Sequence, residues 1–323
     1  MASICIISVY FGSFKNYFKL WLRSCAFNKD IDFIIFTDIE YNDPYPDNVC
    51  FINITLDNLR DLASSKLNID VQLFRPYKCC DLKPMYGAIF EDYITGYDYW
   101  GECDLDLLWG DLYSLMKKNE YYKYDKFLPL GHLSLYRNSQ KVNNAFMLPG
   151  DLKGGWKNVL MTEKNIIFDE INGIGKIFIK NKLPFFYKRI FADISPMFNR
   201  FTLSQKCAVD GVYQKNYRYQ IFYWENGKIY RDYFKKGILY TEEFIYIHFR
   251  SRPNFVVNEE VYFCNSFYIT NTGFIPKKGL TTKKTIELFN SPPLPFSETI
   301  IKYFKDLCYL WKRLTRIISN ERK

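Results

Sequence analysis

The stretch that decides the fold is YDYWGECDLDLLWGDL, residues 97–112. Apolar and aromatic residues run up to Trp100, and two acids follow at Asp104 and Asp106. This pattern predicts a buried strand that ends in carboxylates. Because side chains alternate along a strand, Asp104 and Asp106 are expected on one face, about 7 Å apart. Two such carboxylates persist in a buried site only beside donors or a cation, and a divalent metal ion is the simplest partner.

The composition is that of a globular protein. Of the 323 residues, 48% are hydrophobic and 19% aromatic, which is enough for a substantial core in one large domain or two. Nine cysteines without a CxxC spacing argue against a zinc site or a disulfide framework, and they favour a reducing cytoplasm. The start, MASICIISVYFG, predicts a core strand and no signal peptide, and the lack of a long apolar run predicts no spanning helix.

The positive charge of the chain lies in its C-terminal half. The net charge is +9, and residues 1–150 carry 15 basic and 19 acidic residues, whereas residues 151–323 carry 29 and 16. This excess makes a non-catalytic, basic nucleic-acid-binding protein one hypothesis. No recognised nucleic-acid motif accompanies the charge, and the aromatic residues lie in apolar runs, so no nucleic-acid partner is expected.

Strand and helix patterns alternate in the first part of the chain. Such alternation indicates right-handed βαβ units in an α/β sheet, with ligands bound beyond the carboxyl ends of the strands. Asn226-Gly227 later predicts a hairpin. The predicted strands cover residues 3–9, 32–38, 49–54, 127–130 and 133–136, and the predicted helices cover residues 14–27 and 56–67.

The Asp-X-Asp at the end of a hydrophobic strand resembles the metal and sugar-nucleotide motif of GT-A type glycosyltransferases. The longer stretch WGECDLDLLWGDL resembles a subgroup found among bacterial surface-polysaccharide proteins, which make capsule, O-antigen or lipopolysaccharide. The resemblance covers about residues 1–255. It implies a GT-A nucleotide-diphospho-sugar transferase fold, α/β, with a mixed, mostly parallel central sheet flanked by helices.

The same resemblance implies an activity. The protein would be a metal-dependent glycosyltransferase that moves a sugar from a nucleotide-diphosphate sugar, with a UDP-sugar favoured, to a saccharide or lipid-linked saccharide acceptor. A sugar-phosphate nucleotidyltransferase shares the α/β nucleotide fold and a two-carboxylate metal site, and it is the alternative enzyme. Such enzymes usually carry a Gly-rich, basic loop after the first strand, but residues 10–14 contain one glycine and no arginine.

The donor contacts follow from the resemblance. The loop of Tyr10, Phe11 and Gly12 would hold the base and ribose, with one of the two aromatic rings packed on the base. Lys83, in the segment DLKPMYG, would reach the donor diphosphate. The further donor contacts implied are Asp104, Arg137 and Arg250.

The metal and the catalytic base are placed in the same way. Asp104 and Asp106 would bind Mn²⁺ or Mg²⁺, and His248 would complete the metal shell. Glu170 or Asp169 would accept the proton of the acceptor hydroxyl, although acids at a helix N-terminus are also electrostatically favoured without catalysis. A base at Glu170 predicts inversion of the anomeric carbon, and the absence of a dedicated base would fit retention.

The expected organisation has four parts. Residues 1–138 form the nucleotide-sugar half, residues 139–269 the acceptor half of the same domain, residues 270–296 an irregular connection, and residues 297–323 a basic amphipathic helix. This helix would contact the cytoplasmic face of the inner membrane through residues 297–318, or else cap the core or a dimer. The expected location is the cytoplasm, with peripheral membrane attachment as one outcome, and the oligomeric state stays open.

Overall fold

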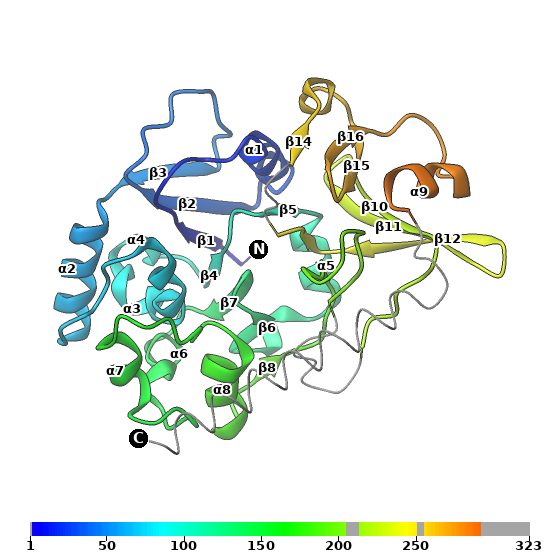
Figure 1. Ribbon diagram of the computed structural model, residues 1–323. Coiled ribbons are helices and arrows are strands. Elements are labelled where there is room, and N and C mark those ends of the chain that lie inside the picture. The colour runs from blue at the N-terminus through cyan, green and yellow to red at the C-terminus, as the bar shows by residue number, and fades with distance from the viewer. Residues whose placement is uncertain (1, 205–212, 251–254, 292–323) are drawn as a thin grey trace, which may run out of the picture.

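A seven-stranded sheet forms the centre of the computed structural model, which describes residues 2–204, 213–250 and 255–291 (Figure 1). The strand order is β3-β2-β1-β4-β7-β6-β8. β1 is parallel to β2 and β4, and β7 is antiparallel to β4 and β6. The predicted α/β class, with a mixed and mostly parallel central sheet, is thus confirmed. The strands are β1 (Ile4–Val9), β2 (Ile31–Thr37), β3 (Val49–Asn53), β4 (Tyr99–Cys103), β6 (Lys126–Leu130), β7 (Leu133–Arg137) and β8 (Phe185–Phe186).

Helices cover both faces of this sheet because its central strands are apolar on both sides. Ile4 and Ile6 pack in one core with α1 and α5, and Cys5 and Ile7 pack in another with α2 and α3. Asp111 caps α5, as its position predicts, by accepting a hydrogen bond from Ser114 N at 3.1 Å. The helices on this sheet are α1 (Phe18–Ala26), α2 (Leu56–Leu67), α3 (Tyr86–Ile89), α4 (Glu91–Ile94), α5 (Leu112–Lys118), α6 (Gln140–Asn143), α7 (Gly155–Leu160) and α8 (Lys176–Lys180).

A second, six-stranded sheet follows, in the order β12-β11-β10-β15-β16-β14. The predicted hairpin turn joins its strands β10 and β11, with positive φ angles at Asn226 (48°) and Gly227 (81°). The irregular connection expected at 270–296 is wrong in part, because the described residues there include β16 and the Thr282-capped helix α9 (Lys283–Phe289). The strands are β10 (Gln220–Glu225), β11 (Lys228–Lys235), β12 (Ile238–Phe244), β14 (Val256–Val257), β15 (Ser266–Thr270) and β16 (Gly273–Pro276).

A three-stranded sheet of β5 (Leu107–Trp109), β13 (Tyr246–His248) and β9 (Ala192–Asp193) brings distant parts of the chain together. The strand expected to run through the acid pair instead ends at Cys103, and the chain then bends so that β5 joins this other sheet. β13 pairs with β5 on one side and with β9 on the other. The bend at 104–106 therefore lies next to the C-terminal strand that carries His248.

The expected C-terminal helix at 297–323 lies outside the described residues. In the described part of the chain, every helix is too short or too polar to cross a bilayer.

Asn28 ties three segments of this fold together. Its side chain is 5% exposed. Its Nδ2 donates to Ser24 O and Gly110 O, both at 3.0 Å, and its Oδ1 accepts from Leu112 N at 2.9 Å. The end of α1 is thereby fixed to the β5–α5 junction.

Replacing Asn28 with Leu should lower the free energy of unfolding by about 3 kcal/mol, because buried backbone groups would lose their partners. Urea denaturation measures this loss. Asn158→Ala is the control, since Asn158 makes an exposed bond to Lys153 O and its loss should change stability by less than about 1 kcal/mol. Equal stability of the two variants would contradict the role given to Asn28.

Candidate functional site

The bend after β4 and the end of β13 gather three potential metal ligands. Asp104, Asp106 and His248 each offer one ligand atom, and these atoms all lie within 4.8 Å of one another. His248 Nε2 is 3.3 Å from Asp106 Oδ1. Neighbouring ligands of an octahedral Mg²⁺ are about 3 Å apart, so this spacing fits a small divalent cation. Two carboxylates and an imidazole also suit Mn²⁺.

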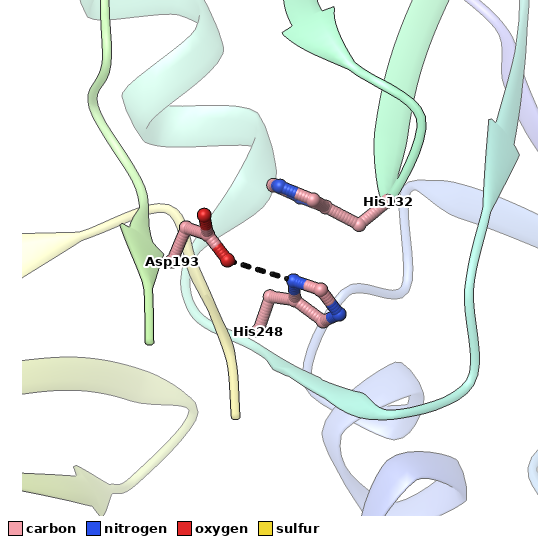
Figure 2. A group of neighbouring side chains, drawn as sticks. All are labelled: His132, Asp193 and His248. Atoms are coloured by element: carbon pink, nitrogen blue, oxygen red, sulfur yellow. Dashed lines mark hydrogen bonds and ion pairs between the residues drawn. The ribbon is translucent and has the colours of Figure 1, made fainter. Parts of the chain in front are cut away.

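Asp193 fixes the orientation of His248 (Figure 2). Its Oδ1 lies 3.0 Å from His248 Nδ1, so that Nε2 is the ring nitrogen that faces Asp106. Arg250 Nη2 in turn donates to both Asp193 oxygens, at 3.0 and 3.2 Å. A carboxylate behind a ligating histidine is the usual support of a metal ligand.

The charges around His248 decide its protonation. Burial alone would lower the pKa of the imidazole, but the carboxylates of Asp106 and Asp193 outweigh burial and raise that pKa to about 10. The pKa of Asp193 is lowered against the effect of its own burial, because it is hydrogen-bonded to His248 and lies near Arg250. In the protein alone, a proton on His248 thus neutralises the acids.

His132 packs directly on His248 (Figure 2). The two ring centroids are 4.4 Å apart with an interplanar angle of 27°. Tyr246 Oη is 2.7 Å from His132 Nδ1, and burial lowers the pKa of His132 well below its usual value. These contacts are those of a structural histidine that holds the ring of His248 in place.

Lys83 lies within a cluster of carboxylates that includes Asp104, one of the candidate metal ligands. Its Nζ is hydrogen-bonded to Asp104 and donates to Gly131 O at 2.5 Å, and it lies 3.6 Å from Asp169 Oδ2 and 3.8 Å from Glu102 Oε2. Although burial opposes the charge, these carboxylates raise the pKa of the ammonium. The expected contact of Lys83 with a donor diphosphate stays a prediction.

The two candidate bases have different surroundings. Burial raises the pKa of Asp169 to about 8, so this carboxyl holds a proton at neutral pH. Glu170 is half-buried, and its side chain accepts no hydrogen bond from the described part of the chain. Burial raises the pKa of Glu170, and the negative charges of Asp193 and Asp104 raise that pKa further. Glu170 is therefore the more exposed of the two acids.

A buried ion pair holds the loop that carries both acids. Lys78 and Asp81 are 1% and 0% exposed, and Lys78 Nζ donates to Asp81 Oδ2, Val159 O and Lys164 O, each at 2.7 Å. Asp81 also accepts from Ile166 N at 2.9 Å and from Phe168 N at 2.8 Å. Between these amides Ile167 has a φ of 62°, which is strained for a β-branched residue. The ion pair thus stabilises the strained backbone conformation at Ile167.

A cavity of about 430 Å³ adjoins the site. Tyr10 and Phe11, at the end of β1, line it together with Lys83, Asp104 and Asp106. Gly12 has a φ of 113° and faces open space. The structure therefore brings the predicted nucleotide loop and the acid pair to one cavity.

Two arginines that are predicted to contact the donor lie outside the lining of this cavity. Arg137 pairs with Tyr99 at the start of β4, whereas Asp104 follows the end of that strand, about 16 Å away along it. Arg137 is bound there to Tyr122 O and to Asp125, and its contact with a donor stays a prediction. Arg250 forms an ion pair with Asp193, which lies behind His248, and its donor contact stays a prediction.

Several residues of the site carry no local sequence signal for the roles they take. Glu102 is fully buried, and neither of its oxygens has a hydrogen-bond partner among the described residues. Asp193 belongs to no recognisable sequence motif, and it lies 55 residues before His248 in the chain. A pairing of β9 with β13 could not be read from strands of two and three residues.

The family of the chain follows from a comparison with known families. A family described as "Family of unknown function (DUF6625)" matches residues 6–278. The chain belongs to this family. The matched region contains every residue of the site, from Tyr10 to Arg250.

No curated protein matches the chain. Among solved structures, the galactosyltransferase LgtC in complex with donor and acceptor sugar analogs is 9% identical, covers 59% of this chain and 76% of its own, and gives a TM-score of 0.34. An active-site mutant of LgtC is 8% identical, with 59% and 75% covered and a TM-score of 0.33.

The variant Asp81→Asn tests the ion pair. It should lower the free energy of unfolding by about 3–5 kcal/mol, since Lys78 would remain buried without its counter-charge. In hydrogen exchange, the amides of Ile166 and Phe168 should lose protection first.

Asp57→Asn is the matched control, because Asp57 forms an ion pair of the same spacing with Arg60 but is 75% exposed. It should leave stability and exchange nearly unchanged. If Asp81→Asn behaves like this control, the ion pair does not hold the loop.

Proposed function

We propose that this protein is a metal-dependent glycosyltransferase of the GT-A type that uses a nucleotide-diphosphate sugar. One observation carries the proposal: Asp104, Asp106 and His248 converge at a cavity that is also lined by the end of the first strand. Open α/β sheets bind their ligands beyond the carboxyl ends of strands. The cavity thus offers a nucleotide site and a divalent cation site side by side.

Asp104, Asp106 and His248 would hold Mn²⁺ or Mg²⁺. A cation at this place would supply positive charge to the diphosphate leaving group, which is worth several kcal/mol of transition-state stabilisation. Asp193 and Arg250 would keep His248 oriented for ligation, and Lys83 would limit the negative charge on Asp104.

Three residues of this chain would take part in the transfer of the sugar. Tyr10 and Phe11 would pack against the base and ribose. The acceptor hydroxyl oxygen would form a bond to the anomeric carbon while the bond from that carbon to the diphosphate breaks. Glu170 would accept the hydroxyl proton, because its carboxylate lies near the site without a hydrogen bond from the described residues. This assignment predicts inversion of the anomeric carbon.

The choice of donor and acceptor rests on the sequence resemblance. A UDP-sugar is the favoured donor, and the acceptor would be a saccharide or a lipid-linked saccharide in bacterial surface-polysaccharide synthesis. The released product separates this proposal from a nucleotidyltransferase, which would release pyrophosphate and no nucleoside diphosphate.

Donor binding can be tested by thermal shift with UDP-, GDP-, CMP- and dTDP-sugars, with and without Mn²⁺. One sugar nucleotide should raise the melting temperature of the wild type, and more strongly with Mn²⁺. Asp106→Asn should lose the Mn²⁺-dependent part, while Asp92→Asn, at an exposed acid, should keep it. The proposal fails if no sugar nucleotide shifts the wild type in either condition.

The base can be tested separately with Glu170→Gln. This variant should keep the thermal shift with donor and Mn²⁺, but its turnover of the sugar nucleotide should fall by about 10²–10⁴-fold, the usual contribution of a general base. Asp169→Asn should lower turnover less, because Asp169 already holds a proton. Wild-type turnover in Glu170→Gln would remove the assigned role and favour a mechanism without a dedicated base.

A further inference from the structure

The hairpin of β11 and β12 ends in an exposed apolar tip, residues 235–240. Lys236 and Gly237 form its two-residue turn, with φ angles of 50° and 82°. The three residues that follow are 59%, 37% and 41% exposed at Ile238, Leu239 and Tyr240. Figure 1 shows the hairpin projecting from the rest of the protein, at the right. Three consecutive apolar residues on a projecting element indicate contact with something other than water.

The apolar residues lie on both faces of the hairpin. Leu239 pairs with Phe234, and Tyr240 pairs with Tyr233. Because side chains alternate along a strand, these two pairs point to opposite faces. A folded partner protein would cover one face, whereas a surrounding apolar medium contacts both. The tip is therefore better suited to insertion into a surrounding apolar medium than to contact with a folded partner.

The exposed charges at the tip are positive. Lys235 and Lys236 are exposed at the turn, and Lys283 Nζ lies 5.5 Å from the ring centroid of Phe234. The acids nearest in the hairpin are engaged, since Asp232 accepts from Thr241 at 2.7 Å and Glu242 is paired with Arg231. The surface at the tip thus complements a negatively charged layer.

Tyr233 and Tyr217 lie directly behind the tip and form a stack with Tyr240 of the tip itself. The rings of Tyr233 and Tyr240 are stacked with centroids 5.5 Å apart, and Tyr217 stacks on Tyr233 at 3.8 Å. Tyrosine is enriched where apolar and polar layers of a membrane meet, and lysine can extend its ammonium toward phosphates from such a depth. From the tip to the base of the hairpin, aliphatic side chains are followed by tyrosines, which is the order expected of an element that enters the interface of a bilayer.

We propose that the tip at 235–240 inserts into the interface of an anionic lipid bilayer. Ile238, Leu239 and Tyr240 would lie at the boundary between headgroups and acyl chains, with Lys235 and Lys236 on the lipid phosphates. This attachment does not depend on the proposed transferase activity, and it involves only described residues.

Sedimentation of the full chain with vesicles tests the proposal. The wild type should bind vesicles of phosphatidylcholine with about one third phosphatidylglycerol, and bind pure phosphatidylcholine weakly. Lys235→Gln with Lys236→Gln should weaken binding by about 25-fold, since each lysine near an anionic surface contributes about fivefold. Ile238→Ser with Leu239→Ser should weaken it by at least about tenfold.

Matched pairs elsewhere on the surface are the controls. Met161→Ser with Ile179→Ser removes two aliphatic groups that are 56% and 47% exposed, and Lys117→Gln with Lys118→Gln removes two adjacent lysines. Both should bind as the wild type does, and all variants should keep its melting temperature.

The proposal is overturned if the wild type does not bind anionic vesicles, or if both tip variants bind as tightly as the wild type. It is also overturned if the tip variants change only the oligomeric state in size-exclusion chromatography, because the tip would then contact a second copy of the chain.

Discussion

The neutralisation of carboxylates around Lys83 is the constraint on which the site depends. Glu102, Asp104 and Asp169 approach one ammonium group, and two of the three are almost fully buried. One positive charge cannot balance three negative ones, so burial keeps a proton on Asp169 and raises the pKa of Glu102. Asp104 is the most exposed of the three, and it is the one whose other side faces Asp106 and His248. The residual negative charge is thus directed toward the cavity, where a cation can reach it.

The second requirement is a junction between sheets. Had β4 continued through the acid pair, Asp104 and Asp106 would have remained in the central sheet, away from the C-terminal strands. Instead β5 pairs with β13, and the register places His248 opposite Leu107 and beside Asp193. Asn28 supports this departure, since it binds both the backbone that follows β5 and the end of α1. The three candidate metal ligands therefore come from both halves of the chain because of one short strand.

The parts of the structure that follow from local patterns could be predicted. The strands β1 to β3, helix α2, the cap at Asp111 and the turn at Asn226-Gly227 each follow from periodicity or from the conformational preference of single residues. Contacts that depend on the register of strand pairing could not be predicted from the sequence. Arg137 lies at the beginning of β4 because it pairs with Tyr99, and Asp193 lies beside His248 because a two-residue strand pairs with β13. Nothing in the local sequence marks Lys78 as buried, yet its ammonium donates hydrogen bonds to three oxygens.

Asp169 and Glu170 show why adjacent acids cannot be assigned from sequence. Both follow the strained Ile167, but Asp169 is buried beside Lys83, whereas Glu170 is partly exposed. Which one turns inward depends on where the loop is anchored. Asp81 anchors it through the amides on either side of Ile167, and Gly131 leaves room for the carboxyl of Asp169, since a Cβ there would lie 2.0 Å from its oxygen. The contrast between a buried acid and a partly exposed one is thus set by contacts with Asp81 and Gly131, far earlier in the chain.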